Sequence, residues 1–204
     1  FDFGQNFLSD IASQFVERYP EIRLDVSLSD RMVDLIADGF DVAFRGGKLE
    51  DSSLVARPMG RGKSWLVASP AYLDAAGRPT SPAALETHEC VLFRAQSGQD
   101  RCFFVDTTAA TETVTVRGRL SSDEYGFVKS VCLNGGGVGC IPWLLCDQEI
   151  ASGRLERVLP GWGIPGGQMH LVYPSAQHLP QRVAAFRDFV LEWIKSPPWS
   201  PPAD

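Results

Sequence analysis

An arginine followed by two glycines is the first place in this sequence where the residue types point to chemistry. Residues 41–45, Asp-Val-Ala-Phe-Arg, form an apolar run without clean alternation, which is typical of a strand covered on both faces. Arg45 ends the run, and Gly46 and Gly47 follow it. Open α/β sheets bind small molecules at the carboxyl ends of their strands, where glycine lets the backbone approach a ligand closely. The pattern predicts a small-molecule site at Arg45, and the alternative is an ion pair with a neighbour beside a simple turn.

Two glycine-rich stretches resemble nucleotide-binding loops but break their patterns. Residues 60–64, GRGKS, end like a phosphate-binding loop, yet Arg57 stands where the first glycine is required and a strand is expected to follow. Residues 135–139, GGGVG, come after a predicted helix and before a predicted strand, and a cysteine follows them. This order inverts the geometry of a dinucleotide-binding turn. We therefore expect no nucleotide cofactor.

No set of side chains in the sequence predicts catalysis or a metal centre. The three histidines form no H-x-x-x-H pair, and His88 with Cys90 would need distant partners to bind zinc. No G-x-S-x-G motif marks a nucleophile elbow. Because no nucleophile, base or metal site can be assembled, we predict binding without chemistry, with no enzyme activity, no metal and no cofactor.

The elements ahead of the arginine are predicted in the order helix, strand, helix. Residues 6–18 carry apolar side chains at helical spacing, and residues 22–28 alternate apolar and polar as a half-buried strand does. Residues 29–39 begin with helix-capping types and end at Gly39, where a left-handed C-cap fits. This second helix would turn Ile36 toward the interior together with the other apolar residues.

The rest of the chain alternates strands and helices in the manner of an α/β protein. Strands are expected over residues 54–59, 64–69, 90–93, 102–105, 114–120, 138–141, 155–159 and 169–173. Helices are expected over residues 124–133, 142–153 and 181–195, with short helical turns from Pro70 and Ala83. A chain of 204 residues can form either one large domain or two lobes of roughly 100 residues each. We place the lobe crossing near Ser69, because the strands from residue 90 onward are assigned to a second sheet.

Composition and charge exclude several classes of protein. Of the 204 residues, 44% are hydrophobic and 22% charged, and the net charge of −6 with scattered Lys and Arg disfavours nucleic-acid binding by these residues. No apolar run approaches the roughly 20 residues that span a bilayer, and no signal segment opens the chain. The five cysteines, an odd number without a C-x-x-C pair, predict buried free thiols rather than a redox switch. We expect a cytoplasmic protein.

Five segments together resemble the effector-binding domain of LysR-type transcriptional regulators. They are residues 15–29 (FVERYPEIRLDVSLS), 39–46 (GFDVAFRG), 52–57 (SSLVAR), 67–73 (VASPAYL) and 137–142 (GVGCIP). The resemblance runs over nearly the whole chain. It implies an α/β fold of two Rossmann-like lobes joined by two hinge strands, like type 2 periplasmic binding proteins. Lobe I would comprise residues 1–68 and 170–196, lobe II residues 69–169, and residues 197–204 a proline-rich tail.

The resemblance implies regulation by a small molecule. Such domains hold a small-molecule co-inducer in the cleft between the lobes and form homodimers or homotetramers. The helix at residues 6–18 and the strand at residues 22–28 would pack against the partner's second lobe near its helix 124–133. They control transcription through an N-terminal winged helix-turn-helix that is absent from this chain, as the family's first strand also is. DNA would be bound only through that part, and no membrane is involved. The alternative is a periplasmic-type solute-binding protein for a transporter, which would be exported and monomeric.

The resemblance also implies roles for individual residues. The predicted effector-binding residues are Asp2, Phe3, Gly4, Ser29, Arg45, Gly46, Phe93, Arg94, Ser121, Ser122, Asp123 and Gly139. The predicted hinge residues are Val67, Ala68, Ser69 and His170. Many family pockets have Ser or Thr hydroxyls near the position of Asp2, and a carboxylate there would satisfy the N–H groups that an anionic effector needs. Either Asp2 turns outward as a cap, or the effector is neutral, cationic or aromatic, with Phe1, Phe3, Phe93 and Trp162 as candidate aromatic walls.

Overall fold

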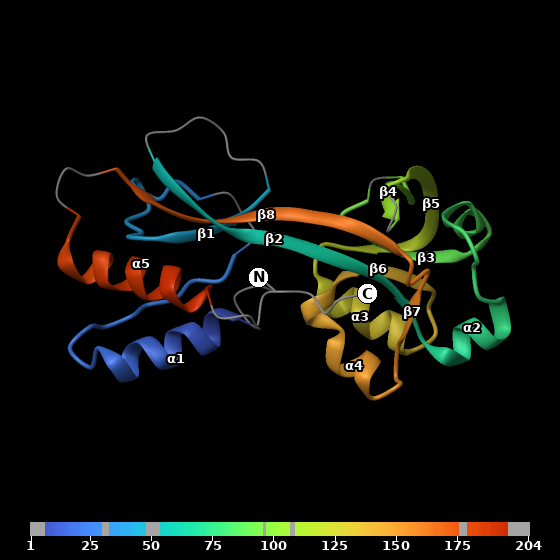
Figure 1. Ribbon diagram of the computed structural model, residues 1–204, viewed down its shortest axis with the longest axis horizontal. Helices are drawn as coiled ribbons and strands as arrows, with labels where there is room; N and C mark the ends of the chain where they lie inside the picture. The colour runs from blue at the N-terminus through green and yellow to red at the C-terminus, as the bar shows by residue number, and fades with distance from the viewer. Residues whose placement is uncertain are drawn as a thin grey trace. The chain divides into compact units, whose positions relative to one another are not determined.

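The chain folds into two compact units. The structure is a computed structural model, and it describes residues 7–29, 33–47, 54–95, 97–106, 109–175 and 179–195. Within these ranges, unit 1 contains the residues up to Arg61 and from Gly167 onward, and unit 2 contains Gly62–Gly166. Two long strands, β2 (Leu54–Ala68) and β8 (Trp162–Pro174), run from one unit into the other (Figure 1). The lobe limits predicted at residues 68 and 170 lie further along these strands and stay a prediction.

Unit 1 places two helices beside a small group of strands. The helices are α1 (Ser9–Arg18) and α5 (Gln181–Trp193), and they lie on one side of β1 (Ala43–Gly46) and of the adjoining parts of β2 and β8 (Figure 1). β1 pairs antiparallel with β8, so that Arg45 lies opposite His170. The helices predicted over residues 6–18 and 181–195 and the strand at residues 41–45 are confirmed.

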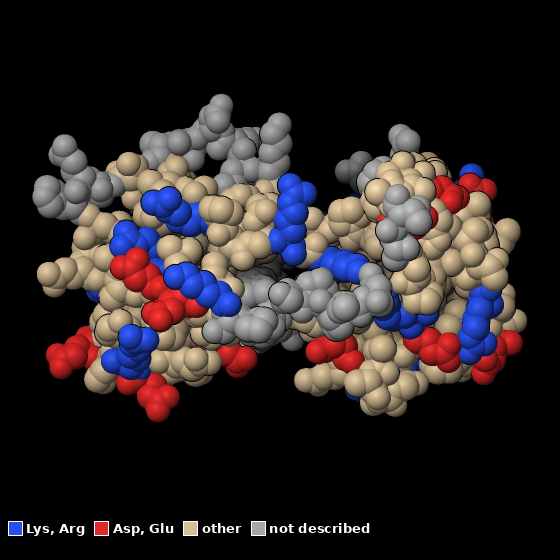
Figure 2. Space-filling view, viewed as in Figure 1, with Lys and Arg blue, Asp and Glu red and all other residues tan. Residues whose placement is uncertain are grey.

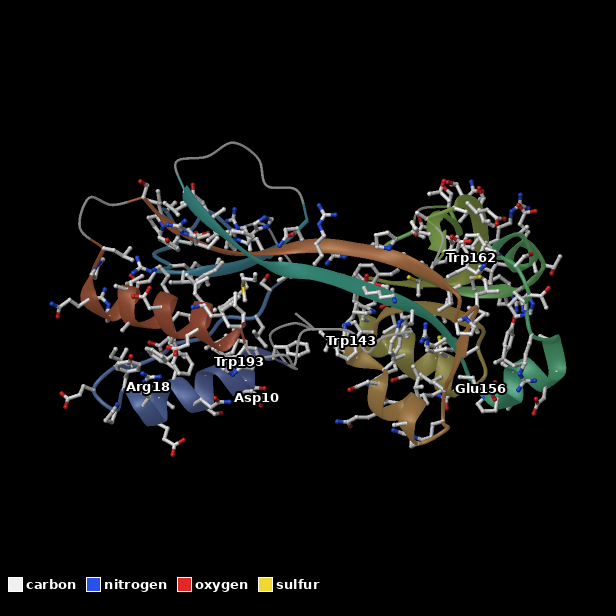
Figure 3. All side chains as sticks on the ribbon, in the orientation of Figure 1. Asp10, Arg18, Trp143, Glu156, Trp162 and Trp193 are labelled. Atoms are coloured by element: carbon white, nitrogen blue, oxygen red, sulfur yellow. The ribbon has the colours of Figure 1, made fainter. Side chains whose placement is uncertain are left out.

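Aromatic rings join the two helices of unit 1. Phe15 of α1 is fully buried, and its ring meets the edge of Phe186 on α5 with 4.9 Å between centroids. Phe189 lies on the same ring of α1 at 5.4 Å. Arg18, at the end of α1, places its guanidinium 6.0 Å from the Phe189 ring (Figure 3). The apolar face that the helical spacing predicts is therefore the face that α1 turns to α5.

Two predictions for unit 1 are wrong. Residues 22–28 form no strand, and no strand among the described residues pairs with them, although Ile22 and Leu24 still pack on the core of the unit. Residues 33–39 form a hydrogen-bonded turn instead of a helix, and Ile36 is 61% exposed rather than inward. Gly39 does take the predicted left-handed backbone, with φ of 73°. Residues 30–32, at the expected start of that helix, lie outside the described residues.

Unit 2 is built on a mixed sheet. Its strands lie in the order β8, β4 (Gln99–Asp106), β5 (Thr111–Ser122), β3 (Glu89–Phe93), β6 (Val138–Pro142), β2 and β7 (Glu156–Val158). β3 runs parallel to β5 and β6, whereas β4 runs antiparallel to β5, and β2 antiparallel to β6 and β7. The parallel centre places the carboxyl ends of β3 and β5 at the same edge, where Phe93 lies opposite Ser122.

Helices cover both faces of this sheet (Figure 1). On one face α2 (Pro70–Ala76) and the 3₁₀ turn η2 (Pro82–Thr87) pack on side chains such as Leu66 and Leu92. The other face carries α3 (Tyr125–Leu133), the turn η3 (Trp143–Leu145) and α4 (Asp147–Ala151). Trp65 of β2 and Trp143 meet there with ring centroids 5.9 Å apart (Figure 3). Because neighbouring residues of a strand point to opposite faces, β2 serves both cores.

The strand and helix limits differ from the predictions in two instructive places. The strands expected over residues 54–59 and 64–69 are one strand, β2, so the GRGKS stretch lies inside a strand and forms no loop. The helix expected over residues 142–153 breaks at Cys146 into η3 and α4. In the first case glycines suggested a break, but strand pairing continues through them. In the second case the residue types suggested one continuous helix, but packing divides it.

Each unit carries charges of both signs on the face that Figure 2 shows. Figure 2 shows Lys and Arg interspersed with Asp and Glu over the face in view of each unit. No helix among the described residues is both long enough and apolar enough to cross a membrane.

Candidate functional site

Arg45 anchors its surroundings in unit 1. It lies on β1, is half-buried, and its guanidinium donates a hydrogen bond of 2.6 Å to the carbonyl oxygen of Val33. Gly46 follows with the Sδ of Met169 only 3.2 Å from the place where a Cβ would stand. The ion pair considered as an alternative is therefore replaced by a charge-assisted bond to a backbone carbonyl. Its partner is Val33, which belongs to no motif and could not be singled out from its residue type.

The turn that Arg45 holds is ordered by carboxylates. Asp34 accepts hydrogen bonds from the N–H groups of Ile36 and Ala37 at 3.0 and 3.1 Å, and Asp38 accepts one from the N–H of Asp34. These side chains compete with helix formation by satisfying the backbone locally, which explains the turn found where a helix was expected. Ser29, a predicted effector-binding residue, is exposed on the chain before this turn.

In unit 2, an aromatic pair marks the carboxyl end of β3. The ring of Phe93 stacks on Tyr125, the first residue of α3, with centroids 3.7 Å apart and planes 6° from parallel. The guanidinium of Arg94 lies 5.2 Å from the centroid of the Phe93 ring. Phe93 and Arg94 were predicted as site residues, whereas Tyr125 was missed because no local pattern links it to Phe93.

Arg94 adopts a backbone conformation that non-glycine residues rarely occupy. Its φ is 50°, and its N–H donates to the carbonyl oxygen of Ser122 at 2.8 Å. Left-handed backbone at such a residue costs energy and persists only where neighbouring contacts impose it. This hydrogen bond joins the loop after β3 to the end of β5. It therefore fixes the position of the Arg94 backbone, from which the side chain extends.

The serines beside this loop are used in different ways. The Ser121 hydroxyl both accepts from the Ala95 N–H at 3.1 Å and donates to the Ala95 carbonyl at 3.5 Å. Ser122 Oγ accepts from the Glu124 N–H at 3.2 Å, and within the described part of the chain its hydroxyl hydrogen has no acceptor. Asp123 is exposed next to it. The structure therefore brings Phe93, Arg94, Ser121 and Ser122 together at one edge of unit 2.

Other predicted residues lie elsewhere. Gly139 is buried in β6, where a Cβ would come within 2.6 Å of Cys132 Sγ, so its lack of a side chain already serves the packing of α3. The predicted hinge residues Val67 and Ala68 pair with neighbouring strands inside unit 2, and Ser69 Oγ accepts from the Tyr72 N–H at the start of α2. Trp162 packs against the core of unit 2. Asp2, Phe3 and Gly4, together with Phe1, lie outside the described residues.

His170, the fourth predicted hinge residue, lies in unit 1 directly across from Arg45. Among the residues that the structure describes, its buried Nδ1 atom has no hydrogen-bond partner. The division between the units crosses β2 at Arg61–Gly62 and β8 at Gly166–Gly167, so neither crossing falls on a predicted hinge residue.

The cysteines are protonated thiols. All five are free, and burial raises the pKa of Cys90, Cys132 and Cys146 to about 12 and that of Cys102 to about 11. Burial also raises the pKa of Cys140. Such thiols are poor nucleophiles and poor metal ligands at neutral pH. Among the described residues, no three His, Cys, Asp or Glu side chains are grouped so that they could hold a metal ion.

Comparison with known proteins decides the family. The model of the LysR substrate-binding domain matches residues 2–195. The chain belongs to the LysR substrate-binding domain family. The HTH-type transcriptional regulator PtxR of Pseudomonas aeruginosa is 31% identical over 97% of this chain and 63% of its own length. The regulatory domain of AphB from Vibrio vulnificus is 29% identical with a TM-score of 0.78, over 94% of each chain. CrgA, a LysR-type regulator from Neisseria meningitidis, is 30% identical with a TM-score of 0.80, over 95% of this chain and 66% of its own.

The LysR family assignment confirms the predicted fold class. The regulatory domains of this family have the two-lobe fold that resembles type 2 periplasmic binding proteins, and the two α/β units of this chain agree with it. The chain spans 63% of the length of PtxR. Because these relatives are transcriptional regulators, the alternative of a solute-binding protein for a transporter is not favoured.

Proposed function

We propose that this LysR-type domain senses a small-molecule co-inducer in the cytoplasm and controls transcription through a winged helix-turn-helix in a longer protein. The family match over residues 2–195 and the regulators among its relatives support this role. The mixed surface charge agrees with DNA contact being made by another part of the full-length protein.

The co-inducer is proposed to bind between the two lobes. Unit 1 would contribute Arg45 and Gly46, and unit 2 would contribute Phe93, Arg94 and the hydroxyl of Ser122. The observation that carries the assignment is the strained backbone of Arg94, with φ of 50°, at the carboxyl end of a parallel strand. Strain of this kind gathers at ligand-binding sites, and strand ends of this kind are where open α/β sheets bind ligands.

Regulation would follow from a shift of population between two arrangements of the lobes. A co-inducer changes that equilibrium only by the difference in its affinity for the two arrangements. Contacts to both lobes supply such a difference, because one arrangement satisfies both sets of contacts and the other satisfies one.

A panel of small metabolites, followed by melting temperature and then by calorimetry, tests this proposal. For a compound that raises the melting temperature, Arg94→Gln and Ser122→Ala should each weaken binding about fivefold to a hundredfold, which corresponds to about 1–3 kcal/mol for a lost polar contact. Arg182→Gln, an exposed arginine on α5, is the matched control and should leave affinity unchanged. Unchanged affinity in both site variants would count against these assignments.

The domain is also proposed to dimerise. Val26 is 49% exposed on the segment after α1, and Phe127 is 48% exposed on α3. Burying large apolar side chains at an interface contributes roughly 1.5–3 kcal/mol each. Pairing α1 and residues 22–28 of one copy with α3 of the other would bury both, as the family resemblance implies.

Light scattering over a range of concentrations tests dimerisation. Phe127→Ser should raise the dimer dissociation constant at least tenfold. Ile36→Ser, at a residue that is 61% exposed on unit 1, is a matched loss of apolar surface and should not change it. A domain that stays monomeric at all concentrations would contradict the dimer and would revive the solute-binding alternative.

A further inference from the structure

A polar hollow lies in unit 2 at the amino end of β3, away from the Phe93 edge. Its volume is about 320 Å³, and its lining residues are Glu86, Thr87, His88, Glu89, Gly98, Arg117, Gly118 and Arg119. They come from the end of η2, the start of β3, the turn before β4 and the middle of β5. β3 separates this hollow from the proposed co-inducer site, because Glu89 and Phe93 are its two ends.

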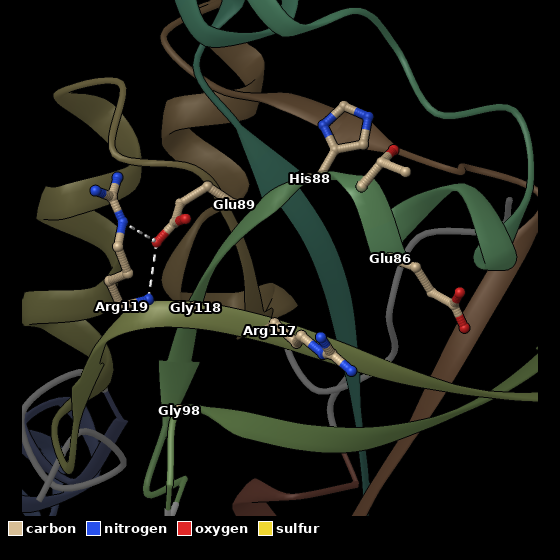
Figure 4. Close-up of a pocket in the computed structure, with 8 residues that line it drawn as sticks. Glu86, His88, Glu89, Gly98, Arg117, Gly118 and Arg119 are labelled. Carbon is tan, nitrogen blue, oxygen red and sulfur yellow. Dashed lines mark hydrogen bonds and ion pairs between the residues drawn. The ribbon is translucent and has the colours of Figure 1, made fainter.

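One pair of charges in the hollow is already satisfied. Glu89 Oε1 accepts from the backbone N–H of Arg119 at 2.8 Å and from its Nε at 3.3 Å. Figure 4 shows this pair on one side of the close-up, with Arg119 reaching toward Glu89. The two charges neutralise each other, so this side of the hollow attracts a charged ligand only weakly.

A second pair of opposite charges is not satisfied. Within the described part of the chain, Glu86 and Arg117 make no side-chain hydrogen bond or ion pair, and both line the hollow. Arg117 extends from β5 toward the side on which Glu86 lies, away from Arg119 (Figure 4). A carboxylate and a guanidinium therefore border the same space without neutralising each other.

Two glycines allow close packing of the backbone in the lining. A Cβ on Gly118 would collide with the backbone of Cys90, and Gly98 has φ of 68° with the Gly118 carbonyl 3.1 Å from its would-be Cβ. Side chains are thus excluded where β5 meets the turn before β4. The two glycines therefore close this side of the hollow with main chain, and the space that a ligand could take lies among the polar side chains of the lining.

We propose that this hollow is a second ligand site that takes a free amino acid as its zwitterion. The α-carboxylate would bind Arg117 and the α-ammonium would bind Glu86, with the side chain of the ligand in the remaining space. A molecule with one charge satisfies one of these two residues, whereas a zwitterion satisfies both. The site is independent of the proposed co-inducer pocket and of the regulatory role.

The expected affinity is modest. Glu86 and Arg117 are both exposed, and ion pairs in contact with water contribute little. We therefore expect a dissociation constant on the order of 1 mM.

Three matched probes test the charge requirement by NMR. Alanine carries both charges, propionate only the carboxylate and ethylamine only the ammonium. Alanine should shift the backbone amide signals of Gly98 and Gly118, and the other two probes should need at least about fivefold higher concentration. If propionate binds as well as alanine, or if no probe moves these signals at up to about 50 mM, the zwitterion site is refuted.

Four variants connect any binding to the named residues. Arg117→Gln and Glu86→Gln should each raise the dissociation constant for alanine about fivefold, and Arg117→Lys should retain most of the affinity because it keeps the charge. Arg23→Gln, at an exposed arginine of unit 1, is the matched control and should bind alanine as the unaltered chain does. Unchanged signals outside the hollow show that each variant is folded. Alanine binding that survives both Gln substitutions would overturn the proposal.

Discussion

Unit 1 joins its helices through phenylalanine rings and contains none of the cysteines, whereas unit 2 contains all five. The halves of the proposed site differ as well. Arg45 in unit 1 is held by a carbonyl oxygen in an ordinary strand, and Arg94 in unit 2 stands on strained backbone above a stacked ring. In unit 1 the arginine therefore stabilises a turn, whereas in unit 2 the position of the arginine depends on backbone strain that lowers stability.

The largest expected effect is a pH dependence of stability that arises in unit 2. The buried thiols of unit 2 keep their protons when folded, with pKa values of about 12 for Cys90 and Cys132 against 9.0 in an exposed thiol. Above about pH 9 the unfolded chain loses these protons while the folded chain keeps them, so stability falls by about 1.4 kcal/mol per pH unit for each thiol. Urea unfolding at several pH values from about 8 to about 10 measures the slope.

A variant tests whether the thiols cause that slope. Cys132→Ala should reduce the loss of stability by about 1.4 kcal/mol per pH unit, whatever it does to stability at neutral pH. Ser13→Ala, on α1 of unit 1, should leave the slope unchanged. Equal slopes for the unaltered chain and Cys132→Ala would contradict the assignment.

The next effect concerns the anchored arginine. Arg45→Ala removes the charge-assisted hydrogen bond to the Val33 carbonyl and should lower the free energy of unfolding by about 1.5–3 kcal/mol. Denaturant unfolding measures this loss. Arg182→Ala, whose pair with Asp41 is 3.6 Å long and exposed, should cost no more than about 1 kcal/mol. A smaller loss for Arg45 than for Arg182 would show that Arg45 is not an anchor.

The aromatic stack of unit 2 should have a smaller effect. Tyr125→Leu keeps apolar bulk but removes the ring that lies 3.7 Å from Phe93, and should destabilise by about 0.5–1.5 kcal/mol. Tyr125→Phe keeps the ring and is the control. If both substitutions cost the same, the hydroxyl rather than the stack supports this edge.

The smallest effect has the opposite sign. Arg94→Gly relieves left-handed backbone and should raise the free energy of unfolding by up to about 1 kcal/mol. Arg45→Gly, in an ordinary strand, should lower it. The two substitutions remove the same side chain, so a loss of stability in both would mean that the φ of Arg94 carries no strain.

Local signals were sufficient for elements that depend on local spacing. The inner faces of α1 and α5 follow from residues such as Phe15 and Phe186, and Arg45 follows from its place at the end of an apolar run. The strand expected at residues 22–28 failed because a strand also needs a partner, which its own sequence does not supply. The stack of Phe93 on Tyr125 and the backbone of Arg94 could not be predicted, because both arise from contacts between segments distant in the chain.

The pairing of β2 with β8 limits which residues the chain can carry at one position. A methyl group on Gly166 would lie 2.5 Å from the backbone of Gly62, so main chain touches main chain there with no room for an atom between. The side chain of any other residue at Gly166 would collide with this backbone and force β2 and β8 apart. A single added carbon atom at this point should therefore disturb the protein more than the loss of a whole charged group from its surface.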